Sequence, residues 1–155
     1  MGNEISNLLD ESIEIELNVS KLYLLYSKIF SEDKDFWWKI ALEEQNHAAL
    51  LKSGKKYLEF GIFPEETVYH DLKKLVESNS EIKGLIENYE RRPPLMDEAY
   101  RAALRLEESA SEIYFQKIME KDSDSKVIKI FQGLNSMNKN HAERIKSLML
   151  KQGIE

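Results

Sequence analysis

The segment EEQNHAALL, residues 43–51, places two polar side chains where an amphipathic helix normally carries leucine. Side chains three or four positions apart share one helix face, so Glu44 and His47 lie on the same stripe as Ile40 and Leu51. A buried, ionised carboxylate costs free energy unless a partner compensates its charge. The segment therefore indicates one of two things. Either solvent or a neighbouring helix accommodates both side chains, or an internal group requires them.

Helical periodicity dominates the rest of the chain, with apolar residues at spacings of three and four and almost no alternating strand pattern. The prolines of RRPP, residues 91–94, and the turn residues of DSDS, residues 122–125, separate the later segments. The pattern predicts four long helices, over residues 4–30, 34–60, 95–121 and 126–152.

The connection between the second and third helices, residues 65–92, is less regular, and Ser80 is a candidate N-cap for one short helix within it. Short turns make antiparallel neighbours, and one long connection lets the second pair of helices join the first. We therefore expect an all-α fold, a four-helix bundle with one long crossover between the second and third helices. The length of the chain predicts a single domain over residues 1–155.

The composition argues against several classes of function. A net charge of −6 is unfavourable for a nucleic-acid surface, which has to neutralise phosphates. The chain has no cysteine, which excludes disulfides, thiolate metal sites and thiol nucleophiles. No apolar run approaches the length of a membrane span, and no leader opens the chain. We expect a cytoplasmic protein without nucleic-acid or membrane partners.

Each predicted helix carries a polar interruption near the middle of its apolar stripe. These interruptions, in chain order, are Glu16, the pair Glu44 and His47, Glu107, and the pair Asn138 and His141. If the helices pack as one bundle, the interruptions meet at one level of the core.

A repeat underlies these positions. Tyr23 follows Glu16 by seven residues, and Tyr114 follows Glu107 by the same interval. The second and fourth helices each contain the tripeptide NHA, which ends at Ala48 in the second. The chain therefore looks like two copies of one helix hairpin.

No lysine or arginine lies on these stripes to pair with the glutamates, which would repel one another in the core. A divalent or trivalent cation resolves the conflict, because it takes hard carboxylate oxygens together with imidazole nitrogen. The i, i+3 spacing of Glu44 and His47 puts both within reach of one ion.

Taken singly, each of these residues has a simpler interpretation. A lone Glu-x-x-His is common on helices, and His141 alone would be a hydrogen-bonded core histidine. Mid-helix glutamates are usually solvated, and we assign Glu108 and Glu112 to solvent. Tyrosines at such positions are ordinarily core aromatics. The joint pattern favours a metal site.

This pattern resembles the ferritin-like di-iron carboxylate proteins, and among them the rubrerythrin-type branch. Such bundles use one glutamate from each of two helices and a Glu-x-x-His from each of the other two. The segment RAALRLEES, residues 101–109, also resembles the start of the second half of rubrerythrin-type sequences. The resemblance implies two iron ions with Glu44 as a bridge between them and five ligands: Glu16, Glu44, His47, Glu107 and His141. Two further residues, Tyr23 and Tyr114, are expected to orient ligand carboxylates from a second layer.

The sequence departs from that family in three respects. Ala110 lies one turn after Glu107, where rubrerythrin itself has an extra glutamate. Asn138 stands where the second bridging glutamate is expected, so it is a weak ligand or none, and the site loses one negative charge. We therefore expect unequal occupancy, down to a single metal or another divalent ion. The absence of cysteine leaves this chain without a rubredoxin-like iron centre, so the electron donor is a separate, unidentified partner.

Three functions remain open at this point. The leading hypothesis is a di-iron oxidoreductase that acts on a small-molecule oxidant, dioxygen or peroxide. The second is a metal-binding protein without turnover, and the third is a helical scaffold whose site has decayed through Asn138. A wide apolar flank of the first helix, from Ile15 to Ile29, predicts either a homodimer interface or packing against the crossover.

Overall fold

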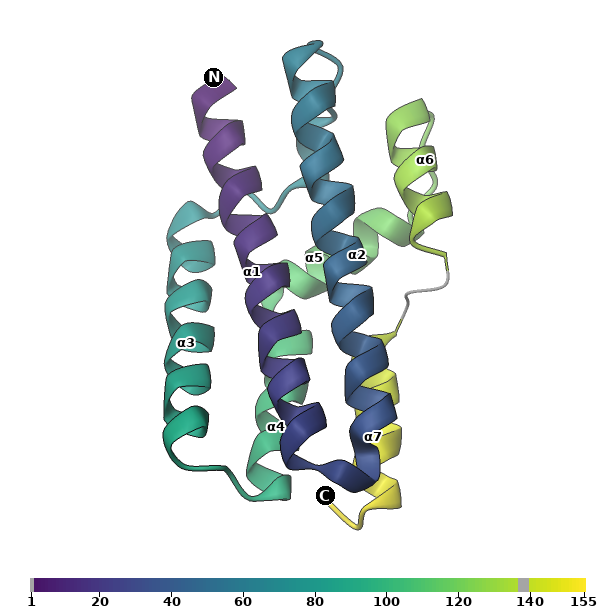
Figure 1. Cartoon of the computed structure of the whole chain (residues 1–155). Coiled ribbons are helices and arrows are strands. Elements are labelled where there is room, and N and C mark those ends of the chain that lie inside the picture. Colours follow the sequence, from purple (N-terminus) through teal and green to yellow (C-terminus); the bar gives the residue numbers. More distant parts are fainter. Residues whose placement is uncertain (1, 137–139) are drawn as a thin grey trace.

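The computed structural model describes residues 2–136 and 140–155, and throughout these ranges the regular structure is helical (Figure 1). Two long helices come first, α1 (Gly2–Ile29) and α2 (Lys34–Glu59), with the short 3-10 turn η1 (Ser31–Asp33) between them. They run antiparallel and pack against each other along the hairpin. Both helices match the predicted ranges, because their apolar spacing is uninterrupted by proline or glycine until Gly54.

The crossover contains a longer helix than the sequence suggested. After the 3-10 turn η2 (Glu65–Thr67), α3 runs over Leu72–Arg91. Asp71 caps it, accepting a hydrogen bond from the Lys74 backbone N–H at 3.1 Å. The prediction of a short helix capped by Ser80 is therefore wrong. The buried stripe of α3 begins before Ser80, and its members are Leu75, Asn79, Ile82, Ile86 and Tyr89.

The flank of α1 packs against this crossover helix. Ile15, Val19 and Leu22 are buried, and Asn79 of α3 reaches α1, donating to the backbone carbonyl of Glu11 at 3.0 Å. Of the two uses predicted for the flank, packing against the crossover is the one found within this chain.

The third and fourth predicted helices are each divided in two. The first gives α4 (Met96–Glu107) and α5 (Ala110–Glu120), and the second gives α6 (Lys126–Leu134) and α7 (His141–Lys151). The prediction of four continuous helices is therefore wrong in the second half of the chain.

Serine and asparagine occupy the ends of the divided helices, where they are better tolerated than in helix interiors. Ser109 has extended backbone angles, φ −66° and ψ 158°, at the start of α5. Its hydroxyl competes with helical hydrogen bonding, so serine favours helix termini over interiors. Asn135 follows the end of α6, and Asn140 precedes α7 with φ 60°, a left-handed conformation that asparagine tolerates better than most residues.

These breaks also change which side chains are buried. Spacings of three and four along the predicted fourth helix place Ile130 and Leu134 on one inner stripe with His141 and Ile145, yet Ile130 and Leu134 are 48% and 64% exposed. Ile128 and Phe131 are buried in their place. The stripe prediction therefore fails before the break and holds after it, where Ile145 is fully buried.

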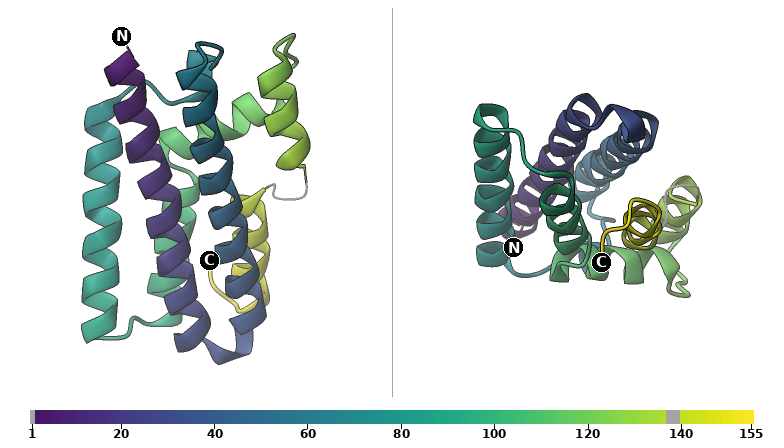
Figure 2. Two further views of the ribbon diagram at one scale, coloured as in Figure 1. Left: turned by 45° about the horizontal axis from the view of Figure 1, so that its top comes forward. Right: turned by 90° about the horizontal axis from the view of Figure 1, so that it is seen from below.

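The helices surround one interior region. In the views of Figures 1 and 2, α4 and α7 face the α1–α2 hairpin, α3 lies against α1, and α5 crosses behind the hairpin. α6 packs against α5. No helix within residues 2–136 and 140–155 is long and apolar enough to cross a membrane.

Hydrogen bonds to Asp33 and an aromatic cluster around Trp37 join the α1–α2 hairpin to α4 and α7 at one end. Asp33 accepts hydrogen bonds from the Tyr100 hydroxyl at 2.6 Å and from the Gln152 amide at 3.0 and 2.9 Å. The indole of Trp37 lies 4.9 Å from the Tyr100 ring and 5.0 Å from the Tyr26 ring, measured between centroids. The start of α2 is thus tied to both α4 and the end of α7.

Candidate metal centre

The predicted ligands within the described residues meet in the interior. Glu16 lies on α1, Glu44 and His47 on α2, Glu107 is the last residue of α4, and His141 is the first residue of α7. All five side chains are buried, with at most 7% of any residue exposed. Asn138 lies outside the described residues.

Glu44 occupies the centre of this cluster. One of its oxygens, Oε1, lies 2.8 Å from Nδ1 of His141, and the other, Oε2, lies 3.4 Å from Nδ1 of His47. The outer carboxylates complete each side, with Glu107 Oε1 3.4 Å from His141 Nδ1 and Glu16 Oε2 3.6 Å from His47 Nδ1. Each histidine therefore faces the central carboxylate and one outer carboxylate.

Three of these residues form a group that could hold a metal ion. Glu44, His47 and His141 each offer one ligand atom, and these atoms lie within 4.8 Å of one another. A carboxylate with two imidazoles suits zinc, iron, manganese and related divalent ions. The structure therefore contains a buried Glu/His cluster with the donor set of a metal site.

Two oxygens of the cluster have unused acceptor capacity. Oε2 of Glu16 and Oε2 of Glu44 are inaccessible to solvent and have no hydrogen-bond donor in the part of the chain that the structure describes. A buried acceptor without a donor costs about 1–3 kcal/mol, and a charged one costs more. Both oxygens face the same interior, so a cation there would compensate them.

The charges of the cluster shift its titration. Burial, and then the charge of Glu44, raise the pKa of Glu16 to about 8. Burial lowers the pKa of His47, but the adjacent carboxylates of Glu16 and Glu44 outweigh it and raise that pKa to about 10. A proton on His47 thus supplies positive charge to this side of the cluster.

The pKa values of His141 and Glu107, on the other side of Glu44, are shifted as well. Burial lowers the pKa of His141, but the charges of Glu44 and Glu107 raise it well above its usual range. Burial raises the pKa of Glu107, and the charge of His141 more than offsets this and lowers it. In the absence of a cation, protonated imidazoles balance the carboxylates, and a bound ion would have to replace those protons.

The two tyrosines of the repeat have different environments. The Tyr23 hydroxyl donates to Glu107 Oε1 at 2.9 Å, where it orients that carboxylate. The structure places Tyr114 elsewhere: its hydroxyl donates to the backbone carbonyl of Glu66 in the crossover. The break before α5 separates Tyr114 from the position that Tyr23 holds, so the repeat is not matched in three dimensions.

The sequence analysis missed two residues that support the cluster from its edge. Glu43 Oε1 accepts from His141 Nε2 at 3.1 Å, and Arg144 forms a two-point ion pair with the same carboxylate at 2.6 and 2.8 Å. Burial raises the pKa of Glu43, but the hydrogen bonds of Arg144 and His141 lower it to about 2. An ionised carboxylate on Nε2 fixes the orientation of the ring and leaves Nδ1 to face the cluster. The only signal in the sequence was the doubled glutamate of EEQNHAALL.

Glu112 also lies closer to the site than expected. The sequence analysis assigned it to solvent, yet it is only partly exposed and lines a small cavity with His47, Glu107 and His141. Burial, and then the charges of Glu16, Glu107 and Glu44, raise its pKa well above the usual range. Glu108, assigned to solvent as well, is exposed and forms an ion pair with Lys146 at 3.3 Å.

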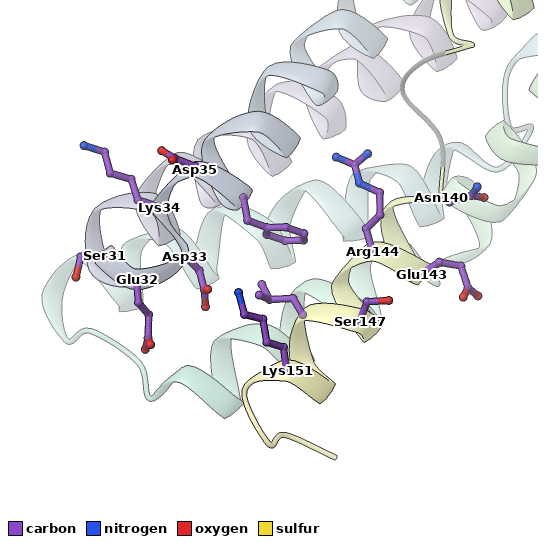
Figure 3. Close-up of a pocket in the computed structure, with 12 residues that line it drawn as sticks. Ser31, Glu32, Asp33, Lys34, Asp35, Asn140, Glu143, Arg144, Ser147 and Lys151 are labelled. Atoms are coloured by element: carbon purple, nitrogen blue, oxygen red, sulfur yellow. The ribbon is translucent and has the colours of Figure 1, made fainter.

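A surface groove of about 990 Å³ lies between the start of α2 and the side of α7 (Figure 3). Its walls include Asp33 and Lys34 on one side and Arg144 and Lys151 on the other. Because Arg144 also holds Glu43, one side chain connects the groove with the buried cluster.

No family model matches this chain, and no curated protein or solved structure matches it either. Its function therefore has to be inferred from the residues of the site and their geometry.

Proposed function

We propose that this chain is a ferritin-like metal protein of the rubrerythrin type, which binds two iron ions and reduces dioxygen or peroxide. The observation that carries the proposal is the position of Glu44. It lies between two buried histidines, with an oxygen toward each, and Glu16 and Glu107 lie on its two sides. A carboxylate in that position is suited to bridging two cations.

The surrounding residues would keep this arrangement in place. Tyr23 orients the Glu107 carboxylate through its hydroxyl, and Glu43 with Arg144 orients His141 through Nε2. These residues fix the direction of the ligand atoms before an ion binds, which reduces the cost of ordering them. Iron held there would supply the redox chemistry that the side chains lack.

The proposal includes two partners. The oxidant is a small molecule, because the cavities beside the cluster are small, about 20 Å³ each. The electron donor is a separate molecule, since the chain has no cysteine to hold an iron centre of its own.

Metal content and oxygen consumption test the proposal. Protein purified without added metal is analysed for bound elements, then titrated anaerobically with Fe(II) and exposed to dioxygen or peroxide. We expect saturable binding, consumption of the oxidant and an absorption band of an oxo-bridged ferric pair. Ferrous protein that binds iron but stays unchanged in air would overturn the oxidoreductase assignment.

His70, the one histidine of the chain outside the cluster, offers a matched control for His141. His141→Ala removes a ligand and should abolish tight binding. His70→Ala removes an exposed histidine whose ring contacts the backbone carbonyl of Glu65, and it should bind iron as the wild type does. Equal loss in both variants would assign the effect to general damage and not to the site.

A metal-binding protein without turnover is the second candidate. The compactness of the Glu44, His47 and His141 group favours it, because three ligand atoms within 4.8 Å of one another suit a single ion. A stoichiometry of one, a raised melting temperature and no reaction with oxidant would select this function.

A further inference from the structure

The break between α4 and α5 turns a glutamate of α5 toward the cluster. In a continuous helix, residues 107 and 112 would point about 140° apart around the axis, because successive residues are separated by about 100°. Here Glu108 and Ser109 interrupt the helix, and Glu112 lines the same cavity as Glu107. The redirection follows from the backbone and could not be read from helical spacing.

Glu112 borders the cluster from two directions. One cavity of about 20 Å³ brings it together with His47, Glu107 and His141. A second cavity of about 20 Å³ brings it together with Glu16. Each is large enough for roughly one water molecule or ion, so Glu112 shares a small interior space with residues of the cluster on both sides.

The charges around Glu112 are unfavourable for a carboxylate. Glu16, Glu107 and Glu44 all act on it, and His141 offsets them only in part. The Glu112 side chain has neither a hydrogen bond nor an ion pair with any residue in the ranges 2–136 and 140–155. Its neighbour Glu108, in contrast, pairs with Lys146 at the surface.

An independent observation points to a ligand at the same place. Oε2 of Glu16 and Oε2 of Glu44 are buried and lack a donor within the described residues. Three carboxylates and the partly buried Glu112 therefore surround a region in which acceptors are in excess. One bound cation would compensate all of them together, in place of the protons that the two histidines carry without it.

We propose that Glu112 is a fourth carboxylate ligand of the cluster, entering from the side of α5. This inference rests on the proposed metal site. It goes beyond that site because Glu112 belongs to no ligand position of the helix pattern. The sequence has the neutral Asn138 where a carboxylate was expected, and Glu112 supplies the missing negative charge from another element.

Cobalt(II) binding by matched variants tests the inference. Wild type, Glu112→Gln and Glu108→Gln are titrated anaerobically with Co(II), followed by calorimetry and by the visible absorption that reports the ligand set. We expect Glu108→Gln to match the wild type. Glu112→Gln should bind one ion fewer, or bind at least about tenfold more weakly, with a changed spectrum.

Stability measurements keep the test independent of folding. Glu112→Gln removes a repelled carboxylate, so the metal-free variant should melt no lower than wild type, while its stabilisation by Co(II) should be smaller. If Glu112→Gln binds Co(II) with wild-type stoichiometry, affinity and spectrum, the inference is wrong.

A further variant separates this inference from the function on which it rests. Glu44→Gln removes the central ligand and should abolish binding in either case. If Glu44→Gln loses Co(II) while Glu112→Gln keeps it unchanged, the metal site stands and the role of Glu112 fails. If the wild type itself binds no Co(II) or Fe(II), both fail.

Discussion

The N-terminal hairpin and the C-terminal half contribute to the same cluster in different ways. α1 and α2 pass the site as continuous helices, with Glu16 and Glu44 in their interiors. Glu107 is the last residue of α4, and His141 is the first of α7. Cluster residues inside a long helix are positioned by its periodicity, whereas those at helix ends are positioned by the adjacent break and by tertiary contacts.

The comparison predicts that stability depends most on the hairpin side. Trp37→Ala should lower the free energy of unfolding by about 3–5 kcal/mol, because it empties a fully buried aromatic position beside Tyr26 and Tyr100. Denaturant unfolding measures it. The adjacent Trp38, 51% exposed, is the control, and Trp38→Ala should cost less than about 1 kcal/mol. Similar losses in the two variants would contradict the assignment of the core to this cluster.

Loss of the hydrogen bond between Tyr100 and Asp33, which joins the two halves, should have the next largest effect on stability. Tyr100→Phe removes the hydroxyl that donates to buried Asp33 at 2.6 Å, and it should cost about 1–3 kcal/mol. Tyr57→Phe, at a partly buried tyrosine on α2, should be near neutral. The prediction fails if the unfolding midpoints of Tyr100→Phe and Tyr57→Phe shift alike.

Metal binding by the cluster should depend on pH. The pKa of His47 is raised to about 10 by Glu16 and Glu44, so without metal the ring stays protonated between pH 6 and 8. A ligand imidazole has to lose that proton, so the apparent affinity should rise with pH, by about tenfold per pH unit for each proton displaced. Calorimetry with Zn(II) in buffers of different ionisation enthalpy counts these protons. An affinity independent of pH over this range would show that His47 is not protonated in the metal-free protein.

Substitutions at two glycines, one in each half of the chain, should have the smallest effects on stability. A Cβ on Gly54 of α2 would lie 2.7 Å from the ring of buried Phe63, so Gly54→Ala should destabilise by about 1 kcal/mol despite its better helix propensity. A Cβ on Gly133 of α6 meets nothing within 4 Å among residues 2–136 and 140–155, and Gly133→Ala should stabilise by about 0.5–1 kcal/mol. Thermal unfolding of both variants measures the difference. Changes of the same sign would show that the two positions are packed alike.

Much of the hairpin and its share of the site could be predicted from sequence. Apolar spacing gave the ranges of α1 and α2, and the i, i+3 relation put Glu44 and His47 on one buried face. Both follow from the fixed geometry of an uninterrupted helix. The same rule misplaced Ile130 and Leu134, because it assumes continuity and α6 ends before α7 begins.

The sequence by itself determined a helical chain with acids and histidines on its inner faces, since side-chain periodicity is a local property. Only the tertiary structure decided where the third and fourth helices break, because weak local propensities at Ser109 and Asn135 compete there with packing. The breaks turn Glu112 toward the cluster and Tyr114 toward the crossover. Contacts between distant segments likewise pair Glu43 with Arg144 and place His141 beside Glu44, and such contacts have no periodic signature in sequence.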